Sequence, residues 1–176
     1  MLTYNVDSEI KLALPRPEID GPKLFALIQA SPNLGDFLPW VKFTKVAADE
    51  ESFLRQCNEH WAKGRSLNLV IHYRNQVVGT LSLNSIHDCH ADIGYWLGQE
   101  FEGYGIMSRS VAGLISLVKE DYPHIKRLEL LADVANTRSN NVAKRLNFTL
   151  EACLKHRLKH YDGTIHSANL YAFYLD

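Results

Sequence analysis

The sequence predicts an α/β fold with a mixed central sheet of about seven strands and about four flanking helices. Three observations support this prediction. Three strand-like segments with short links, between residues 67 and 97, are typical of an antiparallel meander. Residues 92–132 read as strand, loop, apolar helix and strand, an order that favours a right-handed parallel crossover. Two last strand-like segments flank Asp162-Gly163, which is typical of a hairpin turn.

Composition bounds the class of protein. The chain has 176 residues, 46% of them hydrophobic, which suits one globular domain over residues 1–176 with its own core. A net charge of −1 does not favour direct binding of nucleic acid or of an anionic membrane. Three widely spaced cysteines favour reduced thiols in a cytoplasmic protein over a disulfide framework or a zinc site. We expect no signal peptide, because the N-terminus lacks the pattern, and no apolar run approaches membrane-spanning length.

The first elements are expected to be short. Residues 2–14 should form one or two strands, which Pro15 and Pro17 end. A helix should follow, with Asp20 as its N-cap and Pro22 in its first turn.

An aromatic-rich connector over residues 37–43 leads to a second expected helix at 49–63. Such a connector either covers the core or forms one wall of a substrate groove. Gly64 is expected at the C-terminal cap of the second helix. Helical spacing predicts that one side of this helix is buried, the side that carries Phe53, Cys57, His60 and Trp61.

The central strands are expected over residues 67–73, 76–85 and 92–97, with Arg74-Asn75 as a tight turn. Two glycines one residue apart, Gly103 and Gly105, then open an apolar helix that runs to about residue 120. Such a loop presents free backbone N–H groups to an anion, and the helix dipole adds positive charge. A Cβ would hold a phosphate away from the backbone. The loop predicts a phosphate or pyrophosphate site, although an ordinary turn also accounts for two glycines.

The loop does not match two common nucleotide motifs. It lacks the Gly-x-x-x-x-Gly-Lys-Ser/Thr pattern of a P-loop and the third glycine of a dinucleotide fingerprint. After it, a strand is expected over 127–132 and a short helix within 136–148. Asn136 or Thr137 should cap that helix, and Asn147 should end it because asparagine tolerates the left-handed conformation.

Strands over residues 149–158 and 165–175 are expected to close the chain. The aromatic segment Tyr171 to Tyr174 on the last strand belongs either to the core or to the interface of a homodimer.

The glycine loop and its flanks resemble a known family. Glu102-Gly-Tyr-Gly-Ile-Met107 resembles the Gln/Arg-x-x-Gly-x-Gly/Ala loop that holds the acyl-CoA pyrophosphate in the GNAT N-acetyltransferases. The longer run from Gly94 to Ser108 is similar to the RimJ/RimL branch, and most similar to its RimL members. Glu102 and Met107 depart from the general motif, and an acid at Glu102 places like charge near a pyrophosphate.

Residues 136–148 resemble the GNAT segment Asn-x-x-Ser/Ala…Gly-Phe, with Asn147 in place of the usual Gly. The resemblance covers residues 65–176 in sequence and the first third of the chain in element order. It implies the GNAT acyl-CoA N-acyltransferase fold, acetyl-CoA as cosubstrate and transfer of acetyl to an amine. The first choice of acceptor is the N-terminal α-amine of a protein, such as the N-terminal serine of an acidic ribosomal stalk protein.

The resemblance also implies which residues act. Backbone N–H groups at 95–97 would polarise the thioester carbonyl. Ser139 would donate a proton to the CoA thiolate, with Asn136 in the pantetheine or acceptor region unless it serves only as an N-cap. Many GNAT enzymes have a tyrosine where this chain has Ala143. The implied cofactor contacts are Tyr95, Trp96, Leu97, Glu102, Gly103, Tyr104, Gly105, Ile106, Met107, Ser108 and Asn136.

The general base stays unassigned, because the glutamate of the RimL branch is absent from residues 155–160. Imidazole titrates near neutral pH, so His156 and His160 are candidates, as are the acids Glu102 and Asp92. The sequence groups no His and Cys at ligand spacing, so no metal is expected.

Three alternatives remain open from the sequence. The enzyme could acetylate a small amine such as a polyamine, amino sugar or amino acid. The chain could be an acyl-CoA-binding module without turnover, or an unrelated mononucleotide-binding protein. The basic run from Lys155 to Lys159 would suit an acidic partner, although such a run is often only a solvated face.

Overall fold

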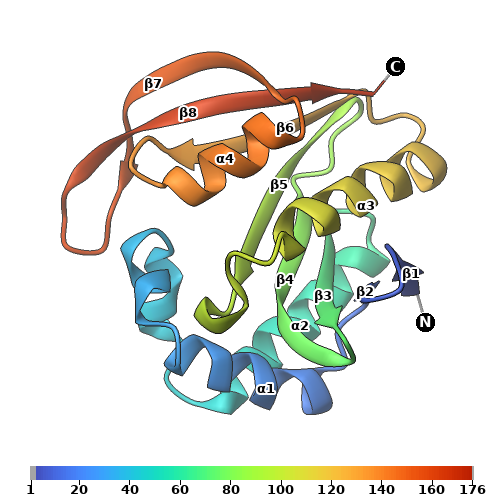
Figure 1. Ribbon diagram of the computed structural model, residues 1–176. Coiled ribbons are helices and arrows are strands. Elements are labelled where there is room, and N and C mark those ends of the chain that lie inside the picture. The colour runs from blue at the N-terminus through green and yellow to red at the C-terminus, as the bar shows by residue number, and fades with distance from the viewer. Residues whose placement is uncertain (1–2, 176) are drawn as a thin grey trace.

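A computed structural model describes residues 3–175, which form one eight-stranded mixed sheet with helices on both faces (Figure 1). The sheet order is β1-β2-β3-β4-β5-β6-β8-β7, and only β5 and β6 pair in parallel. The sheet has one strand more than expected because residues 3–13 form two separate strands. The strands are β1 (Thr3–Asn5), β2 (Ile10–Ala13), β3 (Leu67–Tyr73), β4 (Gln76–Asn84), β5 (His90–Leu97), β6 (Arg127–Asp133), β7 (Thr149–Lys159) and β8 (Ile165–Tyr174).

Four α-helices and three short 3₁₀ helices complete the described chain. They are α1 (Pro17–Gln29), η1 (Pro32–Asp36), η2 (Pro39–Phe43), α2 (Ala47–Ala62), η3 (Gln99–Phe101), α3 (Ile106–Asp121) and α4 (Thr137–Arg145). Within residues 3–175, none of the helices combines the length and the apolar character that crossing a bilayer requires.

Two apolar cores lie on opposite faces of the sheet because side chains alternate along each strand. In β3, Leu69 and Ile71 belong to the core that α3 and α4 cover. Val70, between them, belongs to the smaller core under α1 and α2. The same alternation places Trp96 of β5 in the second core and leaves Tyr95 on the face of α3 and α4.

The sheet opens between β5 and β6. These strands pair in parallel only from His90 opposite Arg127 to Asp92 opposite Glu129, which confirms the predicted parallel crossover. Beyond Asp92, β5 pairs with β4 alone, and beyond Glu129, β6 pairs with β8 alone. The two strands diverge as Figure 1 shows, and their divergence leaves backbone groups of β5 without a strand neighbour.

Most predicted turns are confirmed. Arg74 and Asn75 have φ of 49° and 66°, as a two-residue hairpin turn requires, and Gly163 has a φ of 89° in the last hairpin. Asn147 ends α4 with a φ of 59°. Asn136 is the N-cap of α4, and its Oδ1 accepts a hydrogen bond from the Ser139 N–H at 3.1 Å.

The predicted start of the first helix is wrong by one turn. Arg16 is the N-cap and α1 begins at Pro17, so Asp20 lies inside the first turn and Pro22 lies beyond it, within the helix. From inside the helix, Asp20 binds the N-cap residue. Its carboxylate accepts a hydrogen bond from the Arg16 N–H at 2.8 Å and forms an ion pair with the Arg16 guanidinium at 2.9 Å.

The predicted buried side of α2 is also wrong, except for Cys57. Its buried residues are Glu50, Leu54 and Cys57, whereas Phe53 is 50% exposed and Trp61 is 38% exposed. The buried face of α2 includes the carboxyl group of Glu50, and a pattern of apolar residues cannot predict a buried acidic residue. Gly64 follows the helix with a φ of 67°, as a left-handed C-terminal turn requires.

Replacing Glu50 with glutamine is expected to stabilise the protein at neutral and alkaline pH, and not below about pH 4.5. Burial raises the pKa of Glu50 from 4.5 to about 7, so the folded protein keeps a proton that the unfolded chain releases. The wild type is therefore expected to lose about 3 kcal/mol of unfolding free energy as the pH rises from below 4.5 to above 7, at about 1.4 kcal/mol per pKa unit.

Urea unfolding of Glu50→Gln at about pH 4 and pH 8 checks this. The variant should gain stability over the wild type only at the higher pH. Glu59→Gln, an exposed change on the same helix, is the matched control and should show no such gain. Parallel stability curves for the wild type and Glu50→Gln would contradict the prediction.

The three cysteines are free thiols, as the sequence predicts. Cys57 is buried in α2, and burial raises the pKa of its thiol to about 12, which keeps it protonated. Cys89 and Cys153 are exposed.

Candidate functional site

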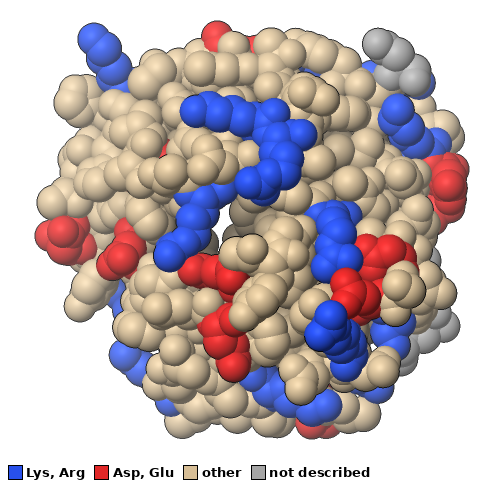
Figure 2. All heavy atoms as spheres, viewed as in Figure 1, with Lys and Arg blue, Asp and Glu red and all other residues tan. Residues whose placement is uncertain are grey.

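A pocket of about 540 Å³ lies beside the part of β5 that has diverged from β6, and its size suits a small-molecule ligand. Its walls come from η1 and the segment after it, from β5, from the glycine loop and start of α3, and from α4. Figure 2 shows a hollow near the middle of the face in view, with basic side chains above it and acidic ones below.

The structure brings most of the predicted site residues into this pocket. Eleven of them line it: Tyr95, Trp96, Leu97, Glu102, Gly103, Gly105, Ile106, Met107, Ser108, Asn136 and Ser139. Tyr104 is not among the lining residues, and its side chain is 66% exposed.

The glycine loop has the geometry of an anion site. Gly103 and Gly105 have φ of 85° and 72°, which glycine adopts readily, and Gly105 is the N-cap residue of α3. Apart from the glycine itself and its two chain neighbours, no atom lies within 4 Å of the position that a Cβ would take at Gly103 or Gly105. The first N–H groups of α3 have no acceptor within the helix, and Gly105 has no side chain to cap them.

Two arginines of α4 that the sequence analysis missed add positive charge to this end of the pocket. Arg138 and Arg145 both line it. The Arg145 Nη1 donates a hydrogen bond of 2.7 Å to the Ser108 hydroxyl, which ties α4 to the first turn of α3. An anion at the loop would therefore meet backbone N–H groups on one side and guanidinium groups on the other.

The carboxylate of Glu102 is paired within the pocket. Its Oε1 accepts a hydrogen bond from the Asn33 Nδ2 at 3.0 Å, and its Oε2 pairs with the Arg138 Nη2 at 3.1 Å. The carboxylate thus connects η1 to α4 across the pocket. Asn33 keeps one buried Oδ1 with no partner in the described structure, an acceptor placed beside the pocket.

The backbone of β5 presents two N–H groups to the gap. In an antiparallel pair, alternate residues face their partner strand. The Gly98 N–H donates to the Val78 carbonyl of β4, so residues of the same parity, including Trp96, face β4. The N–H groups of Tyr95 and Leu97 therefore face the gap, where a carbonyl oxygen could accept from them.

Ser139 and Tyr95 form a hydroxyl pair at the pocket wall. Their oxygens lie 3.0 Å apart, and either hydroxyl can donate. Burial raises the pKa of Tyr95 to about 12, with the Ser139 hydrogen bond opposing the shift in part, so the phenol is neutral near pH 7. The pair can pass a proton from one hydroxyl to the other. From the sequence, Tyr95 is expected only as a backbone donor and a cofactor contact, so the role of its hydroxyl depends on the contact with Ser139.

Asn140, one residue further along α4, fixes this helix to the sheet. It is 5% exposed. Its Nδ2 donates to the carbonyls of Asp133 and Asn136, both at 2.8 Å. Its Oδ1 accepts from Asn169 at 2.7 Å and from Tyr171 at 2.8 Å. Tyr171 is thus a core residue, whereas Tyr174, on the same strand, is 48% exposed.

Of the four candidates for a general base, the structure places two away from the pocket. His156 is exposed on β7, and Asp92 lies where β5 still pairs with β6. Glu102 lines the pocket but is paired as described. His160 lies next to the pocket, because its ring packs edge-on against Phe37, a lining residue, with 6.0 Å between ring centroids.

The aromatic connector forms part of the pocket wall. Phe37 and Leu38 line it, which favours the groove-wall interpretation over a cover for the core. Trp40 packs against Trp96 with 6.2 Å between ring centroids. Further along η2, Phe43 is 70% exposed.

Comparison with known proteins agrees with this geometry. The family model described as "Acetyltransferase (GNAT) domain" matches residues 10–149. The ribosomal-protein-serine acetyltransferase of Escherichia coli (strain K12) is 29% identical over 141 residues, which cover 79% of this chain and 78% of that protein.

Two solved structures share the fold over nearly the whole chain. RimL, a ribosomal L7/L12 α-N-protein acetyltransferase in complex with coenzyme A, superposes with a TM-score of 0.93 at 29% identity, covering 99% of each chain. The microcin C7 self-immunity acetyltransferase MccE, in complex with acetyl-CoA and AMP, superposes with a TM-score of 0.89 at 32% identity, covering 96% of this chain and 94% of that one.

Proposed function

Since this chain belongs to the GNAT acetyltransferase family, we propose that it transfers the acetyl group of acetyl-CoA to the N-terminal α-amine of a ribosomal protein. The first candidate acceptor is the N-terminal serine of a protein like L7/L12, on which similar proteins act. The observation that carries the proposal is the opening between β5 and β6, with an anion site at one end and a hydroxyl pair at the wall.

In this proposal the pocket orients the cosubstrate from end to end. The pyrophosphate lies on the N–H groups of the glycine loop and the start of α3, with Arg138 and Arg145 opposite. The pantetheine follows the gap beside β5. The thioester carbonyl accepts from the backbone N–H groups of Tyr95 and Leu97, which stabilise the oxyanion that forms on attack.

The amine then displaces the thiolate directly. Its nitrogen attacks the thioester carbon, the C–N bond forms, and the C–S bond breaks as the tetrahedral intermediate collapses. The leaving sulfur takes a proton from Ser139, whose hydroxyl Tyr95 supports from 3.0 Å away. Asn136 holds Ser139 in place through the cap on its N–H, and it lines the pocket beside it.

Thiol release from acetyl-CoA against a panel of acceptors tests the proposal. The panel contains acidic peptides that start with Ser or Ala, polyamines and amino sugars. Thermal unfolding with and without acetyl-CoA runs in parallel. Turnover on a Ser-starting peptide supports the proposal, and turnover on small amines alone moves the acceptor to that class. Stabilisation without any turnover supports a binding module. No stabilisation at saturating acetyl-CoA would contradict the assignment of this pocket as the acetyl-CoA site.

A second candidate acceptor is an amine that carries a nucleotide. One similar structure holds AMP together with acetyl-CoA. In this chain, the ammonium of Lys42 on η2 lies over the exposed rings of Phe43 and Tyr161, at 4.8 and 5.0 Å from the ring centroids. Aromatic faces beside a cation can hold a base and a phosphate. Inhibition of thiol release by AMP, in competition with the acceptor, would favour this class of acceptor.

Replacing Glu102 with glutamine is expected to lower the Kd for coenzyme A about threefold, because a negative charge near the pyrophosphate is removed. The amide oxygen can still accept from Asn33, and Arg138 becomes free to meet the ligand. Isothermal titration calorimetry of the variant and the wild type measures the change. Glu59→Gln, an exposed change on α2, is the control. A higher Kd would instead mean that Glu102 holds Arg138 in its binding position.

A homodimer stays a prediction. Tyr171 is buried within the chain, so the exposed part of β8 around Tyr174 is the part available to a second copy. Sedimentation velocity of the wild type and of Tyr174→Ser distinguishes a dimer from a monomer.

A further inference from the structure

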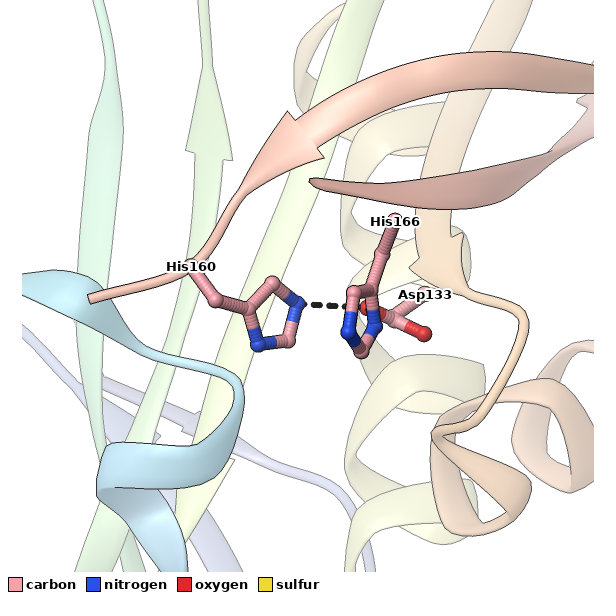
Figure 3. Close-up of side chains that lie close together, drawn as sticks. All are labelled: Asp133, His160 and His166. Atoms are coloured by element: carbon pink, nitrogen blue, oxygen red, sulfur yellow. Dashed lines mark hydrogen bonds and ion pairs between the residues drawn. The ribbon is translucent and has the colours of Figure 1, made fainter. Parts of the chain in front are cut away.

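Three side chains from separate segments meet beside the pocket. Asp133 ends β6, His160 follows β7, and His166 lies on β8 (Figure 3). Asp133 is 4% exposed, and its Oδ2 lies 2.6 Å from the His160 Nε2 and 2.8 Å from the His166 Nδ1. The two imidazole rings are stacked, with centroids 3.9 Å apart.

These distances are those of hydrogen bonds rather than of a ligand set around an ion. Two ligand atoms about 2.0 to 2.1 Å from one metal ion in tetrahedral geometry are roughly 3.3 Å apart, clearly more than either separation here. The described residues thus hold a carboxylate that binds two imidazoles, although their residue types also suit a divalent metal.

The hydrogen bonds leave one ring nitrogen available. An ionised carboxylate only accepts, so each nitrogen that faces Asp133 carries a hydrogen. The second nitrogen of His166, Nε2, lies 3.3 Å from the Thr164 hydroxyl. The second nitrogen of His160, Nδ1, has no hydrogen-bond partner within residues 3–175 and is not sealed from solvent. It keeps its lone pair and can accept a proton.

His160 also lies beside the proposed active site. Its ring packs against Phe37, a residue of the aromatic connector that lines the pocket. Asp133 is connected to the same region, because its Oδ1 accepts the Ala135 N–H at 2.7 Å on the turn that leads to Asn136. The cluster therefore adjoins the pocket wall at Phe37 and the turn that leads to Asn136.

We propose that the Nδ1 of His160 takes a proton from the acceptor ammonium, with Asp133 and His166 as positioning residues that fix its ring. The proposal rests on the proposed function and supplies its missing base. One N–H bond of the ammonium breaks, and an N–H bond forms on the imidazole, which later releases this proton to solvent. The nitrogen loses a second proton after the attack. This proton returns to the Ser139 and Tyr95 hydroxyl pair and replaces the proton that the pair gave to the sulfur.

Charged groups on several elements face this imidazole. Asp133 contacts it from β6 and His166 from β8, while Asp162 lies in the hairpin turn and Lys42 on η2 contacts the neighbouring Tyr161.

The pH profile of kcat/KM for His160→Gln tests the proposal, with thiol release on the best acceptor as the readout. At pH 7 the variant is expected to lose about 100-fold in kcat/KM, and the loss should shrink as the pH rises and the acceptor amine deprotonates unaided. Asp133→Asn and His166→Gln should lose about tenfold, in kcat more than in KM. His124→Gln, an exposed histidine ahead of β6, is the matched control and should leave the profile unchanged.

A fold control and a metal control accompany the kinetics. All variants should bind coenzyme A with the wild-type Kd, which separates loss of a proton acceptor from loss of structure. A His160→Gln enzyme with the wild-type profile would overturn the proposal. Stoichiometric binding of zinc chloride by the wild type, lost in all three cluster variants, would overturn it in favour of a metal site. If the wild-type enzyme shows no turnover on any acceptor, the proposed function is contradicted, and the role proposed for His160 is contradicted with it.

Discussion

Ser139→Ala is expected to lower kcat about 100-fold while the Kd for acetyl-CoA changes less than about twofold. The side chain contributes a hydroxyl 3.0 Å from that of Tyr95, and the cap of α4 depends on the Ser139 N–H, which alanine retains. The leaving thiolate then lacks its nearest proton donor, whereas the anion site at the glycine loop is untouched. Steady-state thiol release and calorimetric binding measure the two quantities separately.

Two further variants define how the hydroxyl pair acts. Tyr95→Phe should also lower kcat, and the double variant should lose little more than the worse single one, because residues on one proton path are not additive. Ser116→Ala, on an exposed part of α3, is the control. Full additivity of the two losses would mean that the hydroxyls act separately.

Asn140→Ala is expected to destabilise the protein by about 3 kcal/mol. The amide makes four hydrogen bonds in a buried position, and its loss leaves the Tyr171 hydroxyl and the Asp133 carbonyl among the groups without that partner. The melting temperature should fall by roughly 6 to 12 °C for a chain of this length.

Thermal and urea unfolding check this value. Asn141→Ala, at the exposed neighbouring position, should change stability by less than about 0.5 kcal/mol. Asn140→Asp separates the accepted from the donated hydrogen bonds of this side chain. It keeps an acceptor for the Tyr171 hydroxyl but loses both bonds that the amide donates. A loss for Asn140→Ala no greater than that for Asn141→Ala would show that the network contributes little.

Local chemistry explains which parts of the fold and site the sequence predicts. Gly103 and Gly105 indicate the anion loop because their φ values suit glycine, and Asn136 indicates a helix start because its side chain caps the next turn. Strand alternation and turn residues likewise place the meander and the last hairpin. The family resemblance supplies the order of the remaining elements and the role that we propose for Ser139.

Contacts between distant segments escape this kind of prediction. Tyr95 and Ser139 are 44 residues apart, and Asp133 is 27 residues from His160. The partner of Glu102 on η1 is 69 residues away, so its charge looks unfavourable in the sequence alone. Burial of Glu50 was missed for a related reason, because a carboxyl group on an inward stripe contradicts the apolar pattern on which such predictions depend.

The parting of β5 and β6 has a consequence for local opening. Only three residue pairs join the two strands, so β6, α4, β7 and β8 form a unit with little ladder contact to the remainder of the sheet. Such units can open without global unfolding, and their amide protons then exchange with solvent early. A bound cosubstrate would bridge both units, so hydrogen–deuterium exchange should slow in β6 and β8 as well as in the glycine loop, far beyond the residues that touch the ligand.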